Sequence, residues 1–322
     1  MLISLLLFAL GLVIVSFSAG RMVDGASSLA KRMNIPDIVI GLTIVALGTS
    51  APELVISIVS ALDGKGDLAV GNVVGSNIFN ILVILGISAT IYPLTLQRNT
   101  IWKEIPLSLL AAIIVFVMAG DMFIDGSGQN QIQRSDGIVL LGFFAIYLYY
   151  TFSIAKKGQH NSEEGQYKSY PVWLSLLMVI GGIVGLTLGG KIMVDNAVNI
   201  AKTLGISDSV IALTLVAAGT SIPELATSIA AAMKRNADIA IGNIIGSNIF
   251  NVFLILGMSA TISPLYPKGL TMLDFSVCIG ASVLLFVSCF VLRPMTLYRI
   301  EGWTMLLLYV GYTVWLIGHS AS

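Results

Sequence analysis

The sequence predicts an all-α integral membrane protein of ten transmembrane helices, built as two inverted-topology repeats of five helices with breaks in helices 2 and 7. Composition, the spacing of apolar stretches and an internal repeat support this fold class. Of the 322 residues, 56% are hydrophobic and 11% are charged, whereas soluble domains carry about 25% charged residues. So few charged side chains cannot cover a water-facing surface, and we expect the chain to lie in a lipid bilayer.

Ten apolar stretches give the positions of the expected helices. Most contain roughly 17–25 predominantly apolar residues, which is enough to cross the hydrocarbon core as a helix. A transmembrane barrel would need alternating segments of ~10 residues, and the sequence has none. The first stretch lacks the positive n-region of a signal peptide and has a counterpart in the second half, so we keep it as structure. We place the helices at residues 2–20, 38–62, 67–91, 103–119, 136–154, 172–190, 209–233, 238–262, 270–291 and 302–318.

An internal repeat relates the two halves of the chain. Residues 41–94 align with residues 212–265 without a gap, and more than half of the aligned positions are identical. LTIVALGTSAPEL aligns with LTLVAAGTSIPEL, and DLAVGNVVGSNIFN aligns with DIAIGNIIGSNIFN. We therefore divide the chain into a first five-helix repeat at 1–154, a cytoplasmic linker at 155–171 and a second five-helix repeat at 172–322, whose most similar segments are about 38–94 and 209–265.

An odd number of helices in each half determines how the halves enter the membrane. Because five is odd, the second half enters from the opposite side, which is the inverted repeat of many secondary transporters, with the ion site at the midplane. Twelve Lys and Arg residues lie on one set of loops and five on the other. The excess of positive charge marks the cytoplasmic side. We expect a multi-pass protein of the cell (inner) membrane with both termini on the non-cytoplasmic side.

Two apolar stretches contain a helix breaker and a carboxylic acid. Residues 48–53 read GTSAPE, and residues 219–224 read GTSIPE. Proline removes a backbone donor and leaves carbonyl groups that must be satisfied within the membrane. A charged Glu53 would add ~2.5 kcal/mol or more at the centre of a helix, and its spacing places it on one face with Thr49 and Ser50. The second segment presents the same set through Thr220, Ser221 and Glu224.

The helices that follow these segments carry amides and hydroxyls at a spacing of four. All candidate ligands are oxygen atoms, which suits Ca²⁺, Na⁺ or Mg²⁺ and argues against zinc or copper. Two ionised carboxylates are neutralised by one Ca²⁺, by two Na⁺ or by two protons, so one pocket can hold either load in turn. The residues are Asn72, Ser76, Asn77 and Asn80 in the first half and Asn243, Ser247, Asn248 and Asn251 in the second.

Other interpretations of these residues remain open. A buried Glu can be a structural hydrogen-bond partner, and a stripe of small residues can serve helix packing alone. Asp37, Asp67, Asp208 and Asp238 are expected to cap helices, and Asp24 is expected to pair with Arg21 at the membrane interface. A cation channel could use the same oxygens. An intramembrane enzyme would need a base near Ser50 or Ser221, and no His or Lys is placed to act as one.

The paired GTS-x-PE and GN-x-x-GSNIFN motifs resemble the α-repeats of the sodium/calcium exchangers, in the calcium/cation antiporter superfamily. The chain is similar to a compact prokaryotic member without a large cytoplasmic regulatory domain. The resemblance implies a ten-helix fold in which helices 2, 3, 7 and 8 form a core and helices 1 and 6 slide past it. It also implies a secondary active antiporter that exchanges Ca²⁺ for Na⁺ by alternating access, with exchange of H⁺ for Ca²⁺ or another divalent cation as the alternative.

The resemblance further implies roles for individual residues. Glu53 and Glu224 correspond to the central Ca²⁺-binding carboxylates, and Thr49 and Thr220 supply backbone or hydroxyl oxygens to Ca²⁺ and to flanking Na⁺ sites. The other matching positions are Ser50, Ser221, Ser76, Ser247, Asn80, Asn251 and, through their carbonyls, Ala46 and Ala217.

One departure from the family pattern concerns the last amide pair. Several relatives have Asp at one of these positions, whereas this chain has Asn80 and Asn251. In potassium-dependent exchangers that acid is tied to K⁺ binding, so the sequence does not favour K⁺ cotransport, and it leaves the Na⁺ stoichiometry open. We expect no resident cofactor and no enzymatic activity. We expect the lipid bilayer and the transported Ca²⁺ and Na⁺, or H⁺, as partners, no nucleic acid because no basic block is present, and a monomer.

Overall fold

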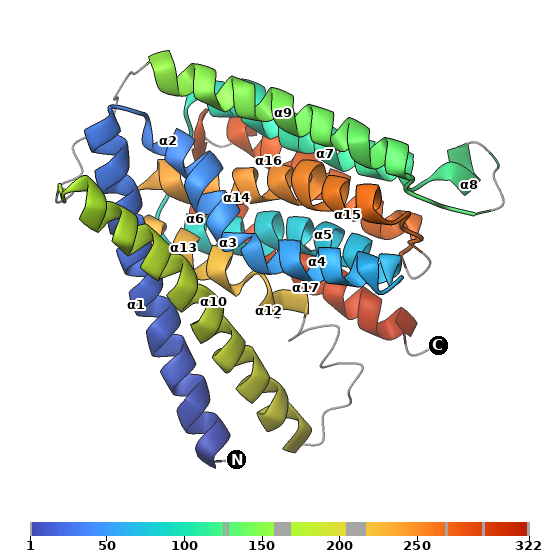
Figure 1. The fold of residues 1–322 in the computed structure, drawn as a ribbon, viewed down its shortest axis with the longest axis horizontal. Coiled ribbons are helices and arrows are strands. Elements are labelled where there is room, and N and C mark those ends of the chain that lie inside the picture. Colours follow the sequence, from blue (N-terminus) through green and yellow to red (C-terminus); the bar gives the residue numbers. More distant parts are fainter. Residues whose placement is uncertain are drawn as a thin grey trace.

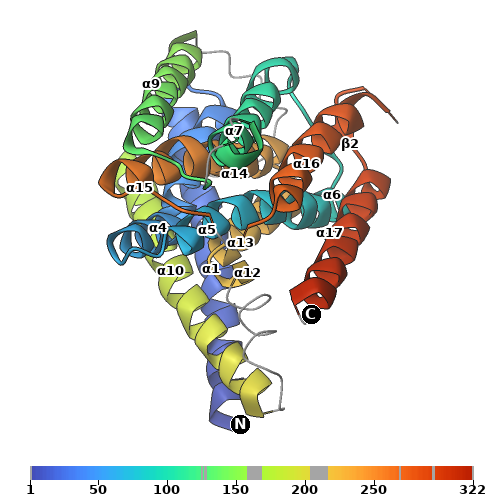
Figure 2. The ribbon, with the colours of Figure 1, turned by 90° about the vertical axis from the view of Figure 1, so that its right-hand side faces the viewer.

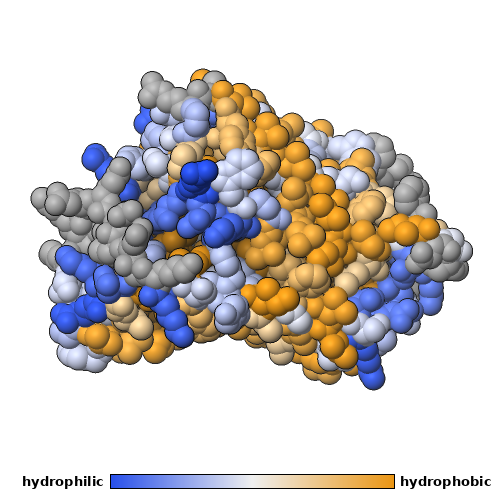
Figure 3. Space-filling model, turned by 90° about the horizontal axis from the view of Figure 1, so that it is seen from above, coloured by the Kyte–Doolittle hydropathy of each residue, from blue (hydrophilic) through white to orange (hydrophobic). Residues whose placement is uncertain are grey.

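The computed structural model describes residues 2–124, 126, 129–157, 169–203, 217–267, 270–291 and 294–320, and nearly all of them are helical (Figure 1). Large apolar side chains such as Phe17, Phe152 and Trp173 are exposed on the helix surfaces. Figure 3 shows a broad apolar area across the molecule, with hydrophilic side chains gathered on both sides of it. An apolar surface of this extent is suited to lipid, so the predicted all-helical membrane-type fold is confirmed.

The elements follow the two halves of the sequence. Those of the first half are α1 (Leu2–Met33), α2 (Asp37–Ile40), the π-helical turn η1 (Gly41–Val45), α3 (Ala46–Thr49), α4 (Ala51–Leu62), α5 (Gly66–Phe79), the π-helical turn η2 (Asn80–Leu85), α6 (Gly86–Ile91), β1 (Leu94–Thr95), the π-helical turn η3 (Thr100–Glu104), α7 (Ile105–Met118), α8 (Asp121–Ile124) and α9 (Arg134–Lys157). Those of the second half are α10 (Val172–Thr203), α12 (Ala217–Gly219), α13 (Ile222–Met233), α14 (Ala237–Ile249), the π-helical turn η5 (Phe250–Leu256), α15 (Gly257–Ile262), α16 (Met272–Val291), β2 (Thr296–Leu297) and α17 (Arg299–Ser320).

Within the described residues, seven helices are long and apolar enough to cross a bilayer. Residues 37–49 and 51–62 form an eighth candidate, a pair of helices bent by 49°. The expected helix at 209–233 begins outside the described residues, as does Asp208, and is seen only from residue 217 onward. Most of the expected linker, residues 158–168, also lies outside them. The count of ten helices therefore stays a prediction.

The two long helices α1 and α10 pack side by side and project from the rest of the molecule (Figures 1 and 2). Gly11 of α1 lies against Gly189 and Met193 of α10, whereas Gly25 lies against Ser175 and Met178. Rising numbers in one helix thus meet falling numbers in the other, so the two helices are antiparallel. Both contain 32 residues and run well beyond the apolar stretches expected at 2–20 and 172–190.

The centre of the molecule consists of α5 with η2 and α14 with η5. Of the most apolar 18 residues in the stretch Ala237–Ile262, 94% are buried, against 22% of the corresponding residues in α1. Gly242 and Gly41 allow α14 and η1 to approach closely, since an added Cβ on Gly242 would lie 3.0 Å from the Cα of Gly41. The π-helical turns η2 and η5 begin at Asn80 and Phe250, beside the two amides of the predicted site; π-helical turns often occur at functional sites.

Small strand pairings are the departure from the all-helical prediction. Leu94 and Thr95 pair antiparallel with Leu297 and Thr296. Leu265, which occupies the position of Leu94 in the second repeat, forms an isolated antiparallel bridge with Ile132. The corresponding leucine of each half therefore pairs with a loop of the other half.

The predicted N-capping roles of Asp37, Asp67 and Asp238 are wrong, and Asp208 lies outside the described residues. Pro36 occupies the N-cap position of α2, and Asp37 is the first helical residue. The side chain of Asn236, not of Asp238, caps α14 by accepting a hydrogen bond of 2.9 Å from the backbone N–H of Ile239. The acids still lie in the first turns, where the helix dipole favours negative charge.

Candidate functional site

The candidate site forms where the two broken helices meet. Ser50 separates α3 from α4, and Thr220 and Ser221 separate α12 from α13. Ser50 and Ser221 have nearly the same backbone angles, φ −81° and ψ 7° against φ −88° and ψ 10°. Pro52 lies in the first turn of α4, so the break begins where proline withdraws a backbone donor. The predicted break in helix 2 is confirmed, and the described part of helix 7 has the same interruption.

Each glutamate accepts a hydrogen bond from the serine of the other half. The Ser50 hydroxyl donates to one carboxylate oxygen of Glu224 at 2.8 Å. The Ser221 hydroxyl donates to one carboxylate oxygen of Glu53 at 3.1 Å. Both carboxylates are only 1% exposed. The two acids, which lie in different halves of the sequence, are therefore joined into one buried cluster by reciprocal hydrogen bonds.

Asn72 and Asn243, the first asparagines of the two polar stripes, hydrogen-bond the backbone carbonyls of the two glutamates. Asn72 donates to the backbone carbonyl of Glu53 at 3.3 Å and to the hydroxyl of Ser57 at 3.0 Å. It accepts a hydrogen bond from Thr220 at 3.4 Å. A donor aimed at the Glu53 carbonyl helps to satisfy the backbone near the break.

The second half repeats these contacts. Asn243 donates to the backbone carbonyl of Glu224 at 3.3 Å and to Ser228 at 2.9 Å. It accepts a hydrogen bond from Thr49 at 3.0 Å. The hydroxyl oxygen of Thr49 also lies 3.3 Å from the carbonyl oxygen of Ala46. Ser57 and Ser228 are functional candidates that the sequence reasoning missed, although they are hydroxyls at equivalent positions of the two repeats, which could have revealed them.

The two serines of the GSN motifs differ in their contacts. Ser247 lies 3.5 Å from the carboxylate oxygen of Glu224 that also accepts from Ser50. The hydroxyl oxygen of Ser76 instead lies 3.2 Å from that of Ser221, within hydrogen-bond distance. Both serines reach the cluster, one directly at a carboxylate and the other through a second hydroxyl.

Four asparagines at the centre of the site form hydrogen bonds between the two halves of the chain. Asn80 donates to the side-chain oxygen of Asn248 at 2.9 Å, and Asn251 donates to the side-chain oxygen of Asn77 at 3.0 Å. Asn77 and Asn248 each donate to the backbone carbonyl of the other, at 3.2 and 3.4 Å. Every one of these bonds joins the two halves. A pattern in which residue i contacts j and j contacts i is typical of a two-fold relationship.

Four buried oxygen atoms of this region accept no hydrogen bond from the described residues. They are the second carboxylate oxygen of each glutamate and the amide oxygens of Asn80 and Asn251. A buried acceptor without a donor costs about 1–3 kcal/mol, and more when it is charged. Two carboxylate and two amide oxygens form the kind of ligand set that hard cations prefer.

The structure brings the predicted residues together. Glu53, Glu224, Thr49, Ser50 and their partners form one network, and the carbonyl of Ala46 lies beside Thr49. Thr220 lies at the break and is partly buried, and Ala217 lies in α12, which ends just before the break. Within the described ranges no group of three or more His, Cys, Asp or Glu residues could hold a metal ion, because amides and hydroxyls supply most of the polar atoms here.

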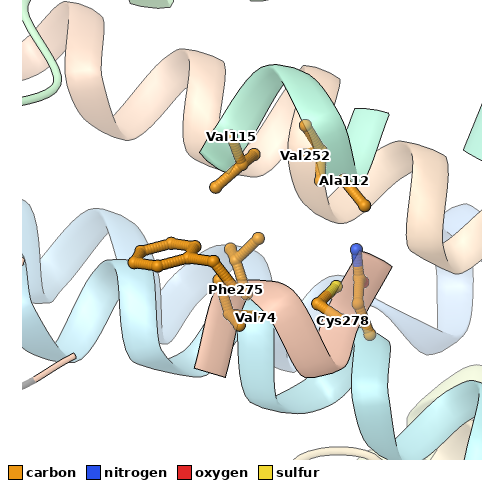
Figure 4. Close-up of a pocket in the computed structure, with 8 residues that line it drawn as sticks. Val74, Ala112, Val115, Val252, Phe275 and Cys278 are labelled. Atoms are coloured by element: carbon orange, nitrogen blue, oxygen red, sulfur yellow. The ribbon is translucent and has the colours of Figure 1, made fainter. Parts of the chain in front are cut away.

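A small, mostly apolar cavity lies beside the site, between α5, α7, η5 and α16 (Figure 4). Val74, Val115, Val252 and Phe275 point into it, and Cys278 lies at its edge. Asn77, one of the four central asparagines, also lines this cavity, so the cavity adjoins the polar site, but its other lining residues offer no side-chain oxygen for a cation.

Comparisons with known proteins identify the family. The family model described as sodium/calcium exchanger protein matches residues 3–153 and 174–318. The chain is 37% identical to the inner membrane protein YrbG of Escherichia coli (strain K12), covering 98% of this chain and 96% of that protein. It is 36% identical to the putative antiporter CaxA of Alkalimonas amylolytica, covering 97% and 98%. It is 29% identical to the sodium/calcium exchanger MaX1 of Methanosarcina acetivorans, covering 97% and 98%.

Solved structures agree with this result. The sodium-calcium exchanger NCX_Mj soaked with zero Na⁺ and Ca²⁺ superimposes with a TM-score of 0.82 at 34% identity, covering 98% of this chain and 99% of that one. The same exchanger soaked with 10 mM Na⁺ and zero Ca²⁺ gives a TM-score of 0.81. The predicted resemblance is thereby confirmed. The chain belongs to the sodium/calcium exchanger family, and it is a membrane antiporter of Ca²⁺ and another cation, not an enzyme.

Proposed function

We propose that the chain exchanges Ca²⁺ for Na⁺ across the cell membrane by alternating access around a midplane site built on Glu53 and Glu224. The observation that carries this proposal is the set of four buried oxygens that accept no hydrogen bond from the described residues. They come in repeat-equivalent pairs from both halves, so a cation bound among them would contact both halves at once. A cation would satisfy all four oxygens, whose burial is otherwise unfavourable.

The proposed ligands are the residues of the sequence prediction. Glu53 and Glu224 provide the central carboxylates, and Asn80 and Asn251 provide neutral amide oxygens. Hydroxyls and backbone carbonyls at the breaks serve the flanking Na⁺ positions, as expected for oxygen-preferring cations. These flanking residues are Thr49, Thr220, Ser50, Ser221, Ser76, Ser247, Ala46 and Ala217.

The proposed topology is two inverted repeats of five helices, at 1–154 and 172–322, joined by a cytoplasmic linker at 155–171. The antiparallel packing of α1 against α10 supports this, because the first helices of the two halves then cross the membrane in opposite directions. The reciprocal hydrogen bonds across the site support a two-fold axis between the halves. With five helices in each half, both termini lie on the non-cytoplasmic side, and we propose that the monomer is the functional unit.

Charge balance explains why such a site would couple two ions. Two ionised carboxylates carry −2, which one Ca²⁺ or two Na⁺ neutralise. An empty pocket would leave both charges in a medium of low dielectric, where like charges repel strongly and solvation is lost. The change of the empty site from facing one side of the membrane to facing the other would therefore be slow. The hydroxyls of Ser50 and Ser221 beside each carboxylate favour Na⁺ over H⁺ as the counter-ion, since they add neutral oxygen ligands.

Uptake of ⁴⁵Ca²⁺ into proteoliposomes tests this function. An outward Na⁺ gradient and an outward H⁺ gradient are compared at clamped voltage, with Glu53→Gln and Glu104→Gln as variants. Glu104 is also a buried carboxylate, but the hydrogen bond described for it is accepted from Tyr150, which is not a residue of the site. We expect uptake with the Na⁺ gradient only, its loss in Glu53→Gln and its retention in Glu104→Gln. Uptake with protons alone would identify an H⁺/Ca²⁺ antiporter, and undiminished flux in Glu53→Gln would refute the carboxylate mechanism.

A further inference from the structure

The four central asparagines fall into two classes. In Asn80 and Asn251 the amide nitrogen is bound and the amide oxygen accepts no hydrogen bond from the described residues. In Asn77 and Asn248 both ends of the amide are bound. All four are buried. Only the first class has an atom free for an ion.

Asn77 and Asn248 determine the orientation of the side-chain amides of Asn80 and Asn251. The amide nitrogen of Asn248 donates to the backbone carbonyl of Asn77, so its oxygen is left as the acceptor. Asn80 must then present its nitrogen to Asn248, and its own oxygen faces the opposite way. Asn77 fixes Asn251 by the same chain of bonds, with the halves exchanged.

We propose that Asn77 and Asn248 are positioning residues, each of which orients an amide oxygen of the other half toward the transported cation. Asn248 of the second half orients Asn80 of the first, and Asn77 of the first half orients Asn251 of the second. This inference rests on the proposed function of the site, and it assigns a role to two residues that the ligand set does not include. The backbone carbonyls that anchor them belong to α5 and α14, the most buried helices.

The charge of the amide ends explains why orientation matters. The oxygen carries the negative end of the amide dipole and the nitrogen carries two positive N–H groups. If Asn80 were free to turn over, its N–H groups would face the cation and repel it. The attraction of a fixed dipole grows with the charge of the ion, so losing the orientation weakens Ca²⁺ binding more than Na⁺ binding.

Double-mutant cycles of Ca²⁺ binding to the purified full-length protein test the assignment, because coupling between residues in contact is what these cycles measure. Groups that orient a metal ligand typically contribute about 10–100-fold in affinity. We expect Asn248→Ala to weaken ⁴⁵Ca²⁺ binding about tenfold alone and to have little further effect in Asn80→Ala. In Asn251→Ala, which shares the helical region but not the hydrogen bond, Asn248→Ala should keep its full effect. The mirrored cycle pairs Asn77 with Asn251.

A further variant keeps the test decisive if alanine prevents folding. Asn248→Leu offers no acceptor to Asn80 and adds no charge to the pocket, so it should weaken Ca²⁺ binding as Asn248→Ala does. The ratio of Ca²⁺ to Na⁺ affinity should fall in Asn248→Leu, an effect that a general loss of packing would not produce. Equal coupling in all pairs, or an unchanged ion ratio, would overturn the inference.

The outcome separates this inference from the proposed function. If the unmodified protein binds Ca²⁺ and Glu53→Gln does not, the carboxylate site stands whatever the asparagine cycles give. If the unmodified protein shows no Glu53-dependent binding of Ca²⁺, the proposed function itself fails. Additive asparagine cycles in a protein with Glu53-dependent binding would therefore refute the positioning role alone.

Discussion

The hydroxyl of Ser50 donates a 2.8 Å hydrogen bond to Glu224, which lies 174 residues further along the chain. Ser221 makes the corresponding bond to Glu53 at 3.1 Å. Each broken helix thus places its serine on the acid of the other broken helix. The two halves are linked at the residues that we propose to bind the ion, so movement of one half changes the surroundings of both carboxylates.

Removing these hydroxyls should weaken ion binding without unfolding the protein. A hydrogen bond to a charged group contributes about 1.5–3 kcal/mol, so we expect Ser50→Ala and Ser221→Ala each to reduce Ca²⁺ affinity about tenfold or more. Isothermal titration of the purified protein measures this. Ser60→Ala is the matched control, because Ser60 of α4 is also buried but has no hydrogen bond to either carboxylate among those described. Affinities in the two serine variants equal to that of the control would argue against the serine link.

Neutralising one carboxylate should separate stability from transport. In Glu224→Gln the pocket charge falls to −1, so exchange of Ca²⁺ should drop by at least about 100-fold, equivalent to about 2.8 kcal/mol. The ion-free variant should unfold at an equal or higher temperature than the unmodified protein, because an uncompensated buried charge is removed. Thermal unfolding in detergent with and without Ca²⁺ measures both effects, since a ligand that binds only the folded state raises the melting temperature. A full Ca²⁺-induced rise in Glu224→Gln would contradict the prediction.

Replacing Asn251 with Asp should change the Ca²⁺ affinity and the number of monovalent cations exchanged for each Ca²⁺. Asn251→Asp raises the pocket charge to −3, so we expect Ca²⁺ affinity to increase about tenfold, or about 1.4 kcal/mol, and the exchange to require additional monovalent cation. Current measurements on reconstituted protein at several Na⁺ concentrations detect the change. Asn72→Asp serves as the comparison, since Asn72 binds backbone and hydroxyl groups behind the site. Identical responses of the two variants would refute the role given to the pair.

A salt bridge joins Asp24 of α1 to Lys234, the C-cap residue of α13. The ammonium nitrogen of Lys234 lies 2.6 Å from a carboxylate oxygen of Asp24 and also donates to the carbonyl of Gly20. The sequence suggests Arg21 as the partner of Asp24, and that prediction is wrong. At the repeat-equivalent positions stand Asp63 and Asp195, which are both acidic and cannot form this pair.

Breaking this bridge should affect turnover more than stability. Its side chains are 29% and 30% exposed, and pairs of this kind contribute about 0–1 kcal/mol. If α1 slides past the core during transport, Asp24→Asn should alter the exchange rate while leaving Ca²⁺ affinity unchanged. Stopped-flow flux in vesicles measures the rate, Asp195→Asn is the control, and the swapped pair Asp24→Lys with Lys234→Asp should restore it. A rate unchanged in Asp24→Asn would exclude a role for the bridge.

Close packing between Gly242 and Gly41 limits the size of the side chain that position 242 can accept. An added Cβ on Gly242 would lie 2.9 Å from the carbonyl oxygen of Ile38 and 3.0 Å from the Cα of Gly41. Both contacts are backbone, which cannot move aside cheaply, so we expect Gly242→Ala to destabilise the fold by about 1–3 kcal/mol. Gly181→Ala is the control, because no atom lies within 4 Å of its added Cβ. The melting temperatures of the two variants should differ, and equal values would contradict the packing.

The sequence by itself determined the membrane-type fold, the repeat and the positions of the helix breaks. Each depends on local chemistry: too few charges to face water, identical residues at a fixed spacing, and a proline that no helix can accommodate within its interior. It also identified both acids and the amide stripes, because polar groups within hydrocarbon are costly and therefore stand out from the apolar residues around them.

The tertiary structure alone decided which partner each polar group takes. Helical spacing gives the face of a residue, but the partner depends on how two separate halves of the chain dock against each other. Asn77 and Asn80 lie one helical turn apart, yet Asn77 is hydrogen-bonded at both ends of its amide, whereas the amide oxygen of Asn80 accepts no hydrogen bond from the described residues. Asp24 pairs with Lys234 across 210 residues. Hydrogen bonds act over about 3 Å, so only the packed structure brings the partners of these bonds within reach.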